Sequence, residues 1–181
     1  MKKIIFLDID GVLATNTEFM RSTKKFHEKF PEAKELRIPY PFNPGCVEIF
    51  NEILNETDVE IVLSSDWKNH YNLEELDKIF KFNGVIKSPF DVTGNEYVSG
   101  DQWVGLEKNR AAQIGSYLYK EQIKDNHITN YVVVDDLNVG NFMQVDKDKF
   151  VLTKDNEGLK QTGIKKKIIK LLNGDIIHKK P

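Results

Sequence analysis

The chain has 181 residues, of which 40% are hydrophobic and 30% charged, and it carries a net charge of -2 with a pI near 6.1. This length suits one compact domain over residues 1–181, and the charge balance excludes nucleic-acid binding through bulk positive charge. Cys46 is the single cysteine, so no internal disulfide can form, and no apolar run approaches the ~20 residues of a membrane helix. We expect a cytoplasmic protein with no membrane partner.

Four short apolar runs predict β-strands. They are continuous rather than alternating and rich in β-branched or aromatic residues, which is typical of strands covered on both faces of a parallel sheet. The first run has only four apolar residues before two acids, so we interpret it as a strand and not as a signal peptide. The runs cover residues 4–7, 59–63, 131–134 and 150–152, with 84–86 as a fifth candidate.

Helical patterns lie between these runs. Asn43 and Pro44 are typical of an N-cap and a first turn, and apolar residues follow at helical spacing. Asn72 and Glu75 resemble a capping box at the start of another helix. Two more helices are expected, over residues 106–123 and 159–172. Because strands and helices alternate, the sequence predicts right-handed crossovers and a doubly wound α/β sheet.

Residues 14–43 break this alternation directly after the first strand. They are rich in Lys, Glu, aromatic residues and Pro, without a strand pattern. An insertion at the carboxyl end of a strand is a common place for a lid or minimal cap that recognises substrate. The alternative is a surface excursion with a short helix around residues 22–30. A cationic, aromatic lid over a phosphorylated base would use Lys24, Lys25, Phe26, Lys29 and Phe30.

Two pairs of carboxylates follow predicted strands. Asp8 and Asp10 come after the first, with Gly11 allowing a sharp turn, and Asp135 and Asp136 come after the third of the four runs. Two residues apart in an extended strand end, Asp8 and Asp10 would point the same way. Clustered carboxylates repel one another in a low dielectric unless a cation lies between them, and Mg²⁺ prefers oxygen ligands. The alternative is that each acid only caps a turn.

A hydroxyl and a cation complete this pattern. Ser64 and Ser65 follow the second strand, and Lys108 and Arg110 lie at the start of a predicted helix. A hydroxyl can donate to a phosphoryl oxygen, and a cation can neutralise charge that develops in the transition state. Either Lys108 or Arg110 could be this cation. Ser65 could contact phosphate or could cap the next turn.

These residues form four ordered motifs that resemble those of the haloacid dehalogenase-like hydrolases: Asp8-Ile9-Asp10-Gly11, Ser64, Lys108 or Arg110, and Val134-Asp135-Asp136. The resemblance implies the sheet order 5-4-1-2-3. A longer stretch is similar to the Ser-Ser-x-Trp-Arg pattern of the small domain in Swiss Army knife RNA-repair proteins: Ser64-Ser65-Asp66-Trp67-Lys68. Residues 150–159 also resemble that subgroup. Lys68 replaces its usual arginine, which keeps the charge but loses the bidentate fork.

The resemblance also implies a role for each residue. Asp8 would attack phosphorus and form an aspartyl-phosphate, Asp10 would act as general acid and then general base, and Ser64 would donate a hydrogen bond to a phosphoryl oxygen. Asp8, Asp135 and the backbone carbonyl of Asp10 would hold Mg²⁺. Asp136 would ligate the ion through water or orient the site.

Three residues are expected to contact substrate: Gly11, Ser65 and Trp103. Trp103 lies in a glycine-flanked stretch, residues 97–105, which fits either a flap near the substrate or a loop without a catalytic part. We interpret Trp67 as packing beneath the site, not as a platform for a base.

The sequence therefore predicts a Mg²⁺-dependent phosphatase. Nucleotides or nucleic-acid ends are the expected phosphorylated substrates, by analogy with the resembled subgroup. The alternatives are a phosphotransferase or mutase that uses the same nucleophile, and a catalytically silent binding module with the same fold. No stable protein partner can be predicted from the sequence.

Overall fold

The computed structural model describes residues 2–15, 22–95, 105–124 and 128–174. Five strands in these ranges form one parallel sheet in the order β3-β2-β1-β4-β5, which is the predicted order read from the opposite edge. The strands are β1 (Lys2–Leu7), β2 (Glu60–Leu63), β3 (Asp91–Val92), β4 (Ile128–Asp135) and β5 (Phe150–Leu152). The predicted fold class and strand order are confirmed.

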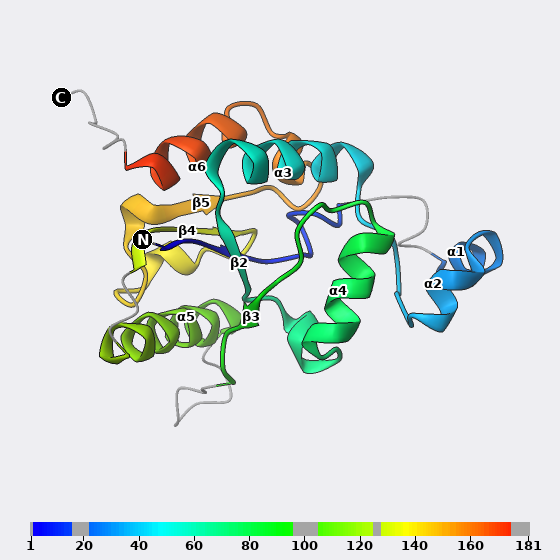
Figure 1. Ribbon diagram of the computed structural model, residues 1–181, viewed down its shortest axis with the longest axis horizontal. Coiled ribbons are helices and arrows are strands. Elements are labelled where there is room, and N and C mark those ends of the chain that lie inside the picture. Colours follow the sequence, from blue (N-terminus) through cyan, green and yellow to red (C-terminus); the bar gives the residue numbers. More distant parts are fainter. Residues whose placement is uncertain (1, 16–21, 96–104, 125–127, 175–181) are drawn as a thin grey trace.

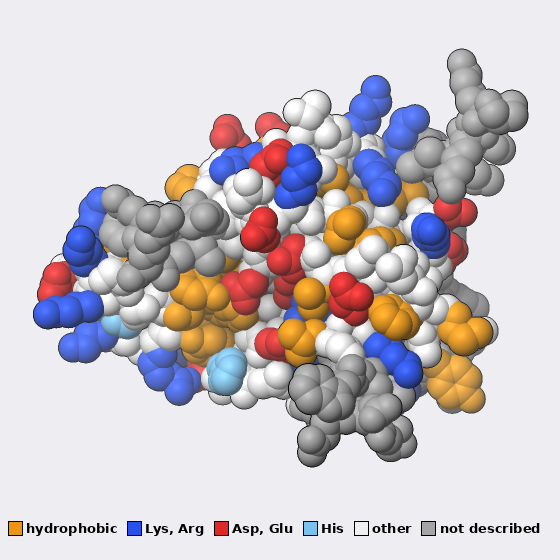
Figure 2. All heavy atoms as spheres, turned by 180° about the vertical axis from the view of Figure 1, so that it is seen from behind, with side chains coloured by type: hydrophobic (Ala, Val, Ile, Leu, Met, Phe, Trp, Pro, Cys, Tyr) orange, Lys and Arg blue, Asp and Glu red, His pale blue; other side chains and the backbone are white. Residues whose placement is uncertain are grey.

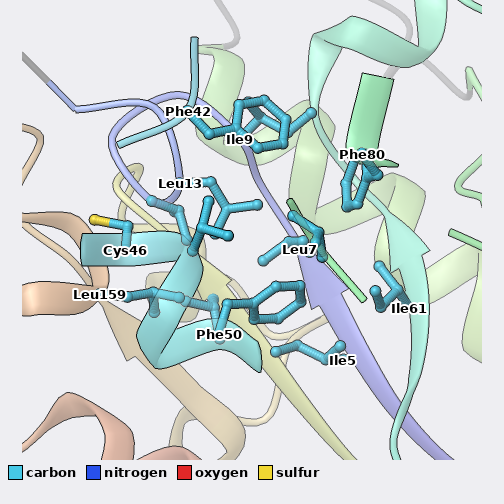
Figure 3. Close-up of a cluster of buried hydrophobic side chains, with 14 of the residues drawn as sticks. Ile5, Leu7, Ile9, Leu13, Phe42, Cys46, Phe50, Ile61, Phe80 and Leu159 are labelled. Atoms are coloured by element: carbon cyan, nitrogen blue, oxygen red, sulfur yellow. The ribbon is translucent and has the colours of Figure 1, made fainter. Parts of the chain in front are cut away.

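Helices cover both faces of the sheet (Figure 1). On one face lie α3 (Pro44–Thr57) and α6 (Ile164–Asn173), and on the other lies α5 (Leu106–Ile123). Ile5 and Leu7 of β1 point into the larger core cluster, shown in Figure 3, while Ile4 and Phe6 pack toward α5. Burial on both faces explains why the strand sequences are continuously apolar. None of the helices in the described ranges is both long and apolar enough to cross a membrane.

Two helix starts follow the predicted capping chemistry. The side chain of Asn43 accepts a hydrogen bond of 3.0 Å from the Gly45 amide at the start of α3. At the start of α4 (Leu73–Phe82), the side chain of Asn72 accepts from the Glu75 amide, and the Glu75 carboxylate accepts from the Asn72 amide. Each cap satisfies amide groups that have no partner inside the helix.

Two predicted boundaries are wrong. Residues 84–86 are not a strand, because Gly84 takes a positive φ of 81° after α4 and the sheet edge is formed instead by the two residues of β3. The last helix begins at Ile164 and not at residue 159, because Gly163 has a φ of 85°. Before this helix, residues Gly158–Lys160 form a short 3-10 turn, η5.

Three other 3-10 turns lie in the described ranges: η2 (Asp66–Asn69), η3 (Val139–Asn141) and η4 (Lys147–Lys149).

The described part of the insertion packs against α4. It contains the expected short helix, α1 (Thr23–Lys29), followed by α2 (Pro31–Glu35), which the sequence pattern did not indicate. The rings of Phe26 and Phe30 both contact Phe82 of α4, with centroids 6.4 and 6.5 Å away. The insertion is therefore a packed element beside α4, and a lid function remains a prediction.

Candidate active site

Three neighbouring strands end in the predicted site residues. Asp8 follows β1, Ser64 follows β2, and Asp135 is the last residue of β4. The Asp8 amide donates to the Val134 carbonyl at 3.1 Å, and the Ser64 amide donates to the Leu7 carbonyl at 2.9 Å. These backbone hydrogen bonds extend the parallel ladders past β1 and β2. They bring the three side chains together at the carboxyl edge of the sheet, where open α/β sheets bind ligands.

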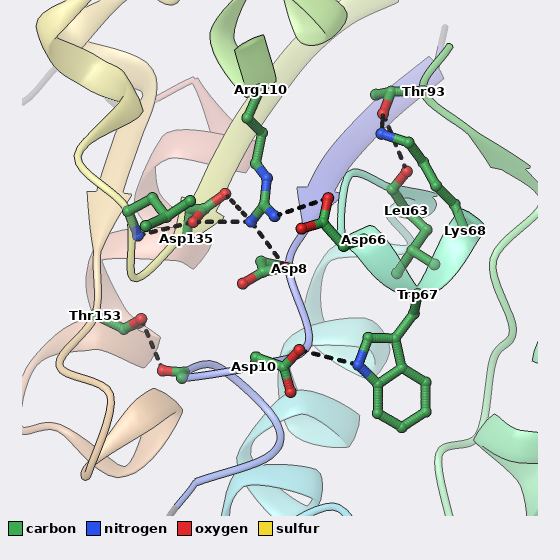
Figure 4. A network of polar contacts seen from close by, with 12 residues as sticks. Asp8, Asp10, Leu63, Asp66, Trp67, Lys68, Thr93, Arg110, Asp135 and Thr153 are labelled. Carbon is green, nitrogen blue, oxygen red and sulfur yellow. Dashed lines mark hydrogen bonds and ion pairs between the residues drawn. The ribbon is translucent and has the colours of Figure 1, made fainter. Parts of the chain in front are cut away.

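A buried arginine lies against two of these carboxylates (Figure 4). Arg110, in the second turn of α5, is only 6% exposed, and its Nη1 lies 2.9 Å from Asp8 Oδ1 and 3.1 Å from Asp135 Oδ2. Its Nη2 lies 3.6 Å from Asp66 Oδ1. Among the described contacts, none joins Lys108 to these acids. Of the two predicted cations, Arg110 is the one that the fold places in the site.

Three carboxylates form a cluster that can hold a metal ion. Asp8, Asp135 and Asp136 each offer an oxygen, and these atoms lie within 4.8 Å of one another. Burial raises the pKa of Asp135 to about 6 despite the nearby Arg110. Burial, reinforced by the charge of Asp135, also raises the pKa of Asp8 well above its ordinary value. Both groups therefore lack enough positive charge around them to ionise easily.

The charge and donor set of this cluster fit a hard divalent cation. Three ionised carboxylates and one guanidinium leave two uncompensated negative charges. Oδ1 of Asp8 is buried and has no hydrogen-bond partner among the described residues, although it lies in the ion pair with Arg110. Carboxylate oxygens are the ligands that Mg²⁺ prefers, so Asp8, Asp135 and Asp136 are suited to hold it.

Gly11 lets the loop after β1 approach this cluster. Its φ is 68°, and a Cβ at this position would collide with the carboxylate of Asp136. Its amide donates to the Ala14 carbonyl at 2.9 Å, and its carbonyl accepts from the Thr153 hydroxyl at 2.9 Å. Glycine is therefore required here by both the backbone conformation and the close approach. Its expected contact with substrate remains a prediction.

Two buried hydroxyls at the carboxyl end of β2 have no hydrogen-bond partner in the described structure. Oγ of Ser64 and Oγ of Ser65 are both fully buried. Ser65 precedes η2, but its side chain makes no capping hydrogen bond, so the capping alternative is wrong. Its hydroxyl is near enough to lower the pKa of Asp8, without the geometry of a well-formed hydrogen bond. Burying a hydroxyl without a partner is costly, which favours a ligand that accepts from it.

Asp10 has partners of a different kind. The Tyr40 hydroxyl donates to its Oδ1 at 2.6 Å, and Trp67 Nε1 donates to its Oδ2 at 3.0 Å. Figure 4 shows the Asp10 carboxylate turned toward Trp67 and away from Arg110. Asp8 and Asp10 therefore do not share one set of partners, and the prediction that they point the same way is wrong, because the chain leaves β1 at Leu7 and turns before Asp10.

Sequence reasoning missed both of these donors. Trp67 is buried as expected, but it also holds the predicted acid. Tyr40 comes from the insertion, where no motif indicates a site residue. One signal could have pointed to it, since Pro39 and Pro41 flank Tyr40 and proline fixes the backbone φ. An aromatic residue held between two prolines near the strand's carboxyl end is a candidate for a fixed contact.

The remaining predicted residues lie elsewhere. Lys68 Nζ donates to Thr93 Oγ1 at 2.9 Å and to Gln113 Oε1 at 2.6 Å, so it ties η2 to the residue after β3 and to the middle of α5. Trp103 lies outside the described residues, and its expected contact with substrate stays a prediction.

The fold and site together define a Rossmann-like α/β protein with an acidic site at the carboxyl edge of its sheet. A family model described as the HAD domain in Swiss Army Knife RNA repair proteins matches residues 4–164. The chain belongs to this family, which lies in a hydrolase superfamily of phosphatase type that generally uses Mg²⁺. No curated protein and no solved structure matches the chain significantly.

Proposed function

We propose that this protein is a Mg²⁺-dependent phosphatase in which Asp8 is the nucleophile. The carrying observation is the setting of Asp8, which directly follows the central strand β1 and is 2% exposed. Arg110 lies 2.9 Å from its Oδ1, an oxygen that lacks a hydrogen-bond partner among the described residues. A carboxylate kept close to a fixed positive charge and to unpartnered hydroxyls is suited to attack a phosphoryl group that brings its own oxygens.

The reaction has two displacements. In the first, a carboxylate oxygen of Asp8 forms a bond to phosphorus, the bond from phosphorus to the leaving oxygen breaks, and Asp10 gives its proton to that oxygen. In the second, Asp10 takes a proton from water, the water oxygen bonds to phosphorus, and the bond from phosphorus to Asp8 breaks. The products are an alcohol and inorganic phosphate, and Asp8 and Asp10 return to their starting states.

The surrounding residues hold and neutralise the phosphoryl group. Arg110 offers a guanidinium at the nucleophile, and the hydroxyls of Ser64 and Ser65 are available to donate to phosphoryl oxygens. Asp8, Asp135 and Asp136 would hold Mg²⁺, which would supply positive charge to offset the charges of the carboxylates and the phosphoryl group. Tyr40 and Trp67 fix the orientation of Asp10.

Nucleotides or nucleic-acid ends are the proposed substrates. The printed family name refers to RNA repair, which supports this class by analogy. The described insertion contains two short helices and no large cap, so the substrate side of the site is not enclosed by a second domain within the described residues.

The test is the release of inorganic phosphate from a panel of nucleotides, oligonucleotide 3′ and 5′ ends, sugar phosphates and phosphopeptides. Asp8→Asn should lower kcat/KM at least on the order of 10³-fold. Asp58→Asn is a matched control, because Asp58 is fully exposed and has a φ of 51° that asparagine also tolerates. Turnover by Asp8→Asn within a few-fold of wild type contradicts the mechanism. Loss of ester without release of phosphate would instead indicate a phosphotransferase.

A further inference from the structure

A cavity of about 380 Å³ adjoins Asp10. Its volume lies at the lower end of the range for small-molecule sites, about 300 to 1,000 Å³. Figure 2 shows hydrophobic side chains gathered beside acidic ones on one face of the molecule. The cavity combines both kinds of side chain. It is lined by Asp10, Pro39, Tyr40, Asp66, Trp67, His70 and Tyr71.

The aromatic rings of this cavity present apolar surface to a ligand. Trp67 contacts Tyr40 edge to face at 5.7 Å and Tyr71 at 5.5 Å with an interplanar angle of 35°. The polar atoms of these rings are already used, since Tyr40 and Trp67 donate to Asp10 and the Tyr71 hydroxyl donates to the Arg37 carbonyl at 2.6 Å. What remains is ring surface, which favours a flat, unsaturated group.

The charged groups of the cavity restrict the occupant further. Asp10 and Asp66 contribute carboxylates, and no lysine or arginine is among the described lining residues. Arg37 lies 5.7 Å from the centroid of the Tyr71 ring, but its charge is paired with Glu75. A second phosphate would be repelled there. His70 and Asp66, whose side chain is 58% exposed, can exchange hydrogen bonds with a polar ring edge. These features fit a neutral ring with polar edges, as in a nucleobase.

The position of Asp10 connects this cavity to the reaction. Asp10 lines the cavity and is the group that protonates the leaving oxygen in the proposed function, on which this inference rests. The leaving group must therefore lie on the side of Asp10 that faces the rings. We propose that the cavity binds the base of a nucleoside that carries a single phosphate, and that this phosphate is the one presented to Asp8.

The kinetic test compares adenosine 5′-monophosphate with ribose 5-phosphate, which has the same ester but no ring. We expect kcat/KM for the nucleotide to be at least about tenfold higher, since stacking of a base on aromatic side chains has an effect of this order. Equal values for the two esters would overturn the proposal.

Variants of Tyr71 assign this preference to the ring. Tyr71→Leu should reduce the nucleotide-to-sugar ratio several-fold, and Tyr71→Phe should retain it, because phenylalanine keeps the ring and loses only the hydroxyl bonded to Arg37. Tyr119→Leu, at a tyrosine that is 65% exposed on α5, should retain the ratio. If Tyr71→Leu also retains it, the proposed ring contact is refuted.

A binding measurement separates this inference from the proposed function. Adenosine binding to wild type and to Asp8→Asn is measured by ligand-observed NMR with ribose as the control, and requires no turnover. We expect adenosine but not ribose to bind, more weakly in Tyr71→Leu. Absence of adenosine binding overturns the cavity proposal even if phosphate esters are hydrolysed. Binding without hydrolysis of any ester supports the cavity and refutes the phosphatase.

Discussion

Raising the pH should destabilise the metal-free protein through Asp135. Burial raises the pKa of Asp135 from 3.8 to about 6, which Arg110 only partly opposes. The folded state thus prefers the protonated carboxyl, so this contribution to stability is fully present below about pH 4 and is lost as the pH rises through about 6. A rise from 3.8 to about 6 corresponds to about 3 kcal/mol. Asp8 acts in the same direction, since burial also raises its pKa.

The free energy of unfolding measured by urea titration with a chelator, at pH 4 and pH 8, tests this linkage. Wild type should lose about 2 to 3 kcal/mol more than Asp135→Asn over this range, because asparagine cannot ionise. At pH 8, Mg²⁺ at about 100 times its Kd should raise the free energy of unfolding of wild type by about 2.7 kcal/mol, and that of the variant by less. An identical pH dependence of the two proteins, or equal stabilisation by Mg²⁺, would refute the reasoning.

Substitutions at other positions separate the parts of the site. Arg110→Ala should lower kcat on the order of 100-fold, and Lys108→Ala less than about threefold; equal losses in steady-state kinetics would contradict the choice of cation. Gly11→Ala should lower the free energy of unfolding by about 1 to 3 kcal/mol, because its Cβ would collide with Asp136, and an unchanged denaturant midpoint would contradict this. Tyr40→Phe, which removes a 2.6 Å hydrogen bond, should lower kcat about tenfold with little change in KM; an effect on KM alone would exclude action through the general acid.

The fold could be predicted because its strands are buried on both faces. Continuous apolar runs identify β1, β2, β4 and β5, and capping residues identify the starts of α3 and α4. The edge strand could not be found in this way. It has only two residues, Asp91 and Val92, both half-buried, so neither length nor composition distinguishes it from a loop. Its position is determined by pairing with β2, which local sequence does not encode.

The sequence does not identify the cation of the site for a related reason. Lys108 and Arg110 are two residues apart on α5, so they point about 200° apart around the helix, and only the docking of α5 decides which one faces the sheet. A signal was nevertheless available. Ala111 and Ile114 are buried against the sheet, and Arg110 lies one and four residues before them, on the same helix face. A buried face that includes one arginine predicts a partner of opposite charge for it.

In the proposed mechanism, the separation of Asp8 from Asp10 lets one short motif serve two tasks. A residue that binds a metal ion must lie beside the ion, whereas a residue that exchanges a proton with the leaving oxygen must lie within hydrogen-bond reach of that oxygen. The turn after Leu7, with the bridge between Asp10 and Ala14, sends the two side chains to different neighbours. Asp8 joins Asp135 and Asp136, while among the described residues the donors to the Asp10 oxygens are the neutral groups of Tyr40 and Trp67. Because Tyr40 belongs to the insertion, the segment that borders the substrate side also orients the acid, and a change in its packing would alter the proton transfer before it altered the metal cluster.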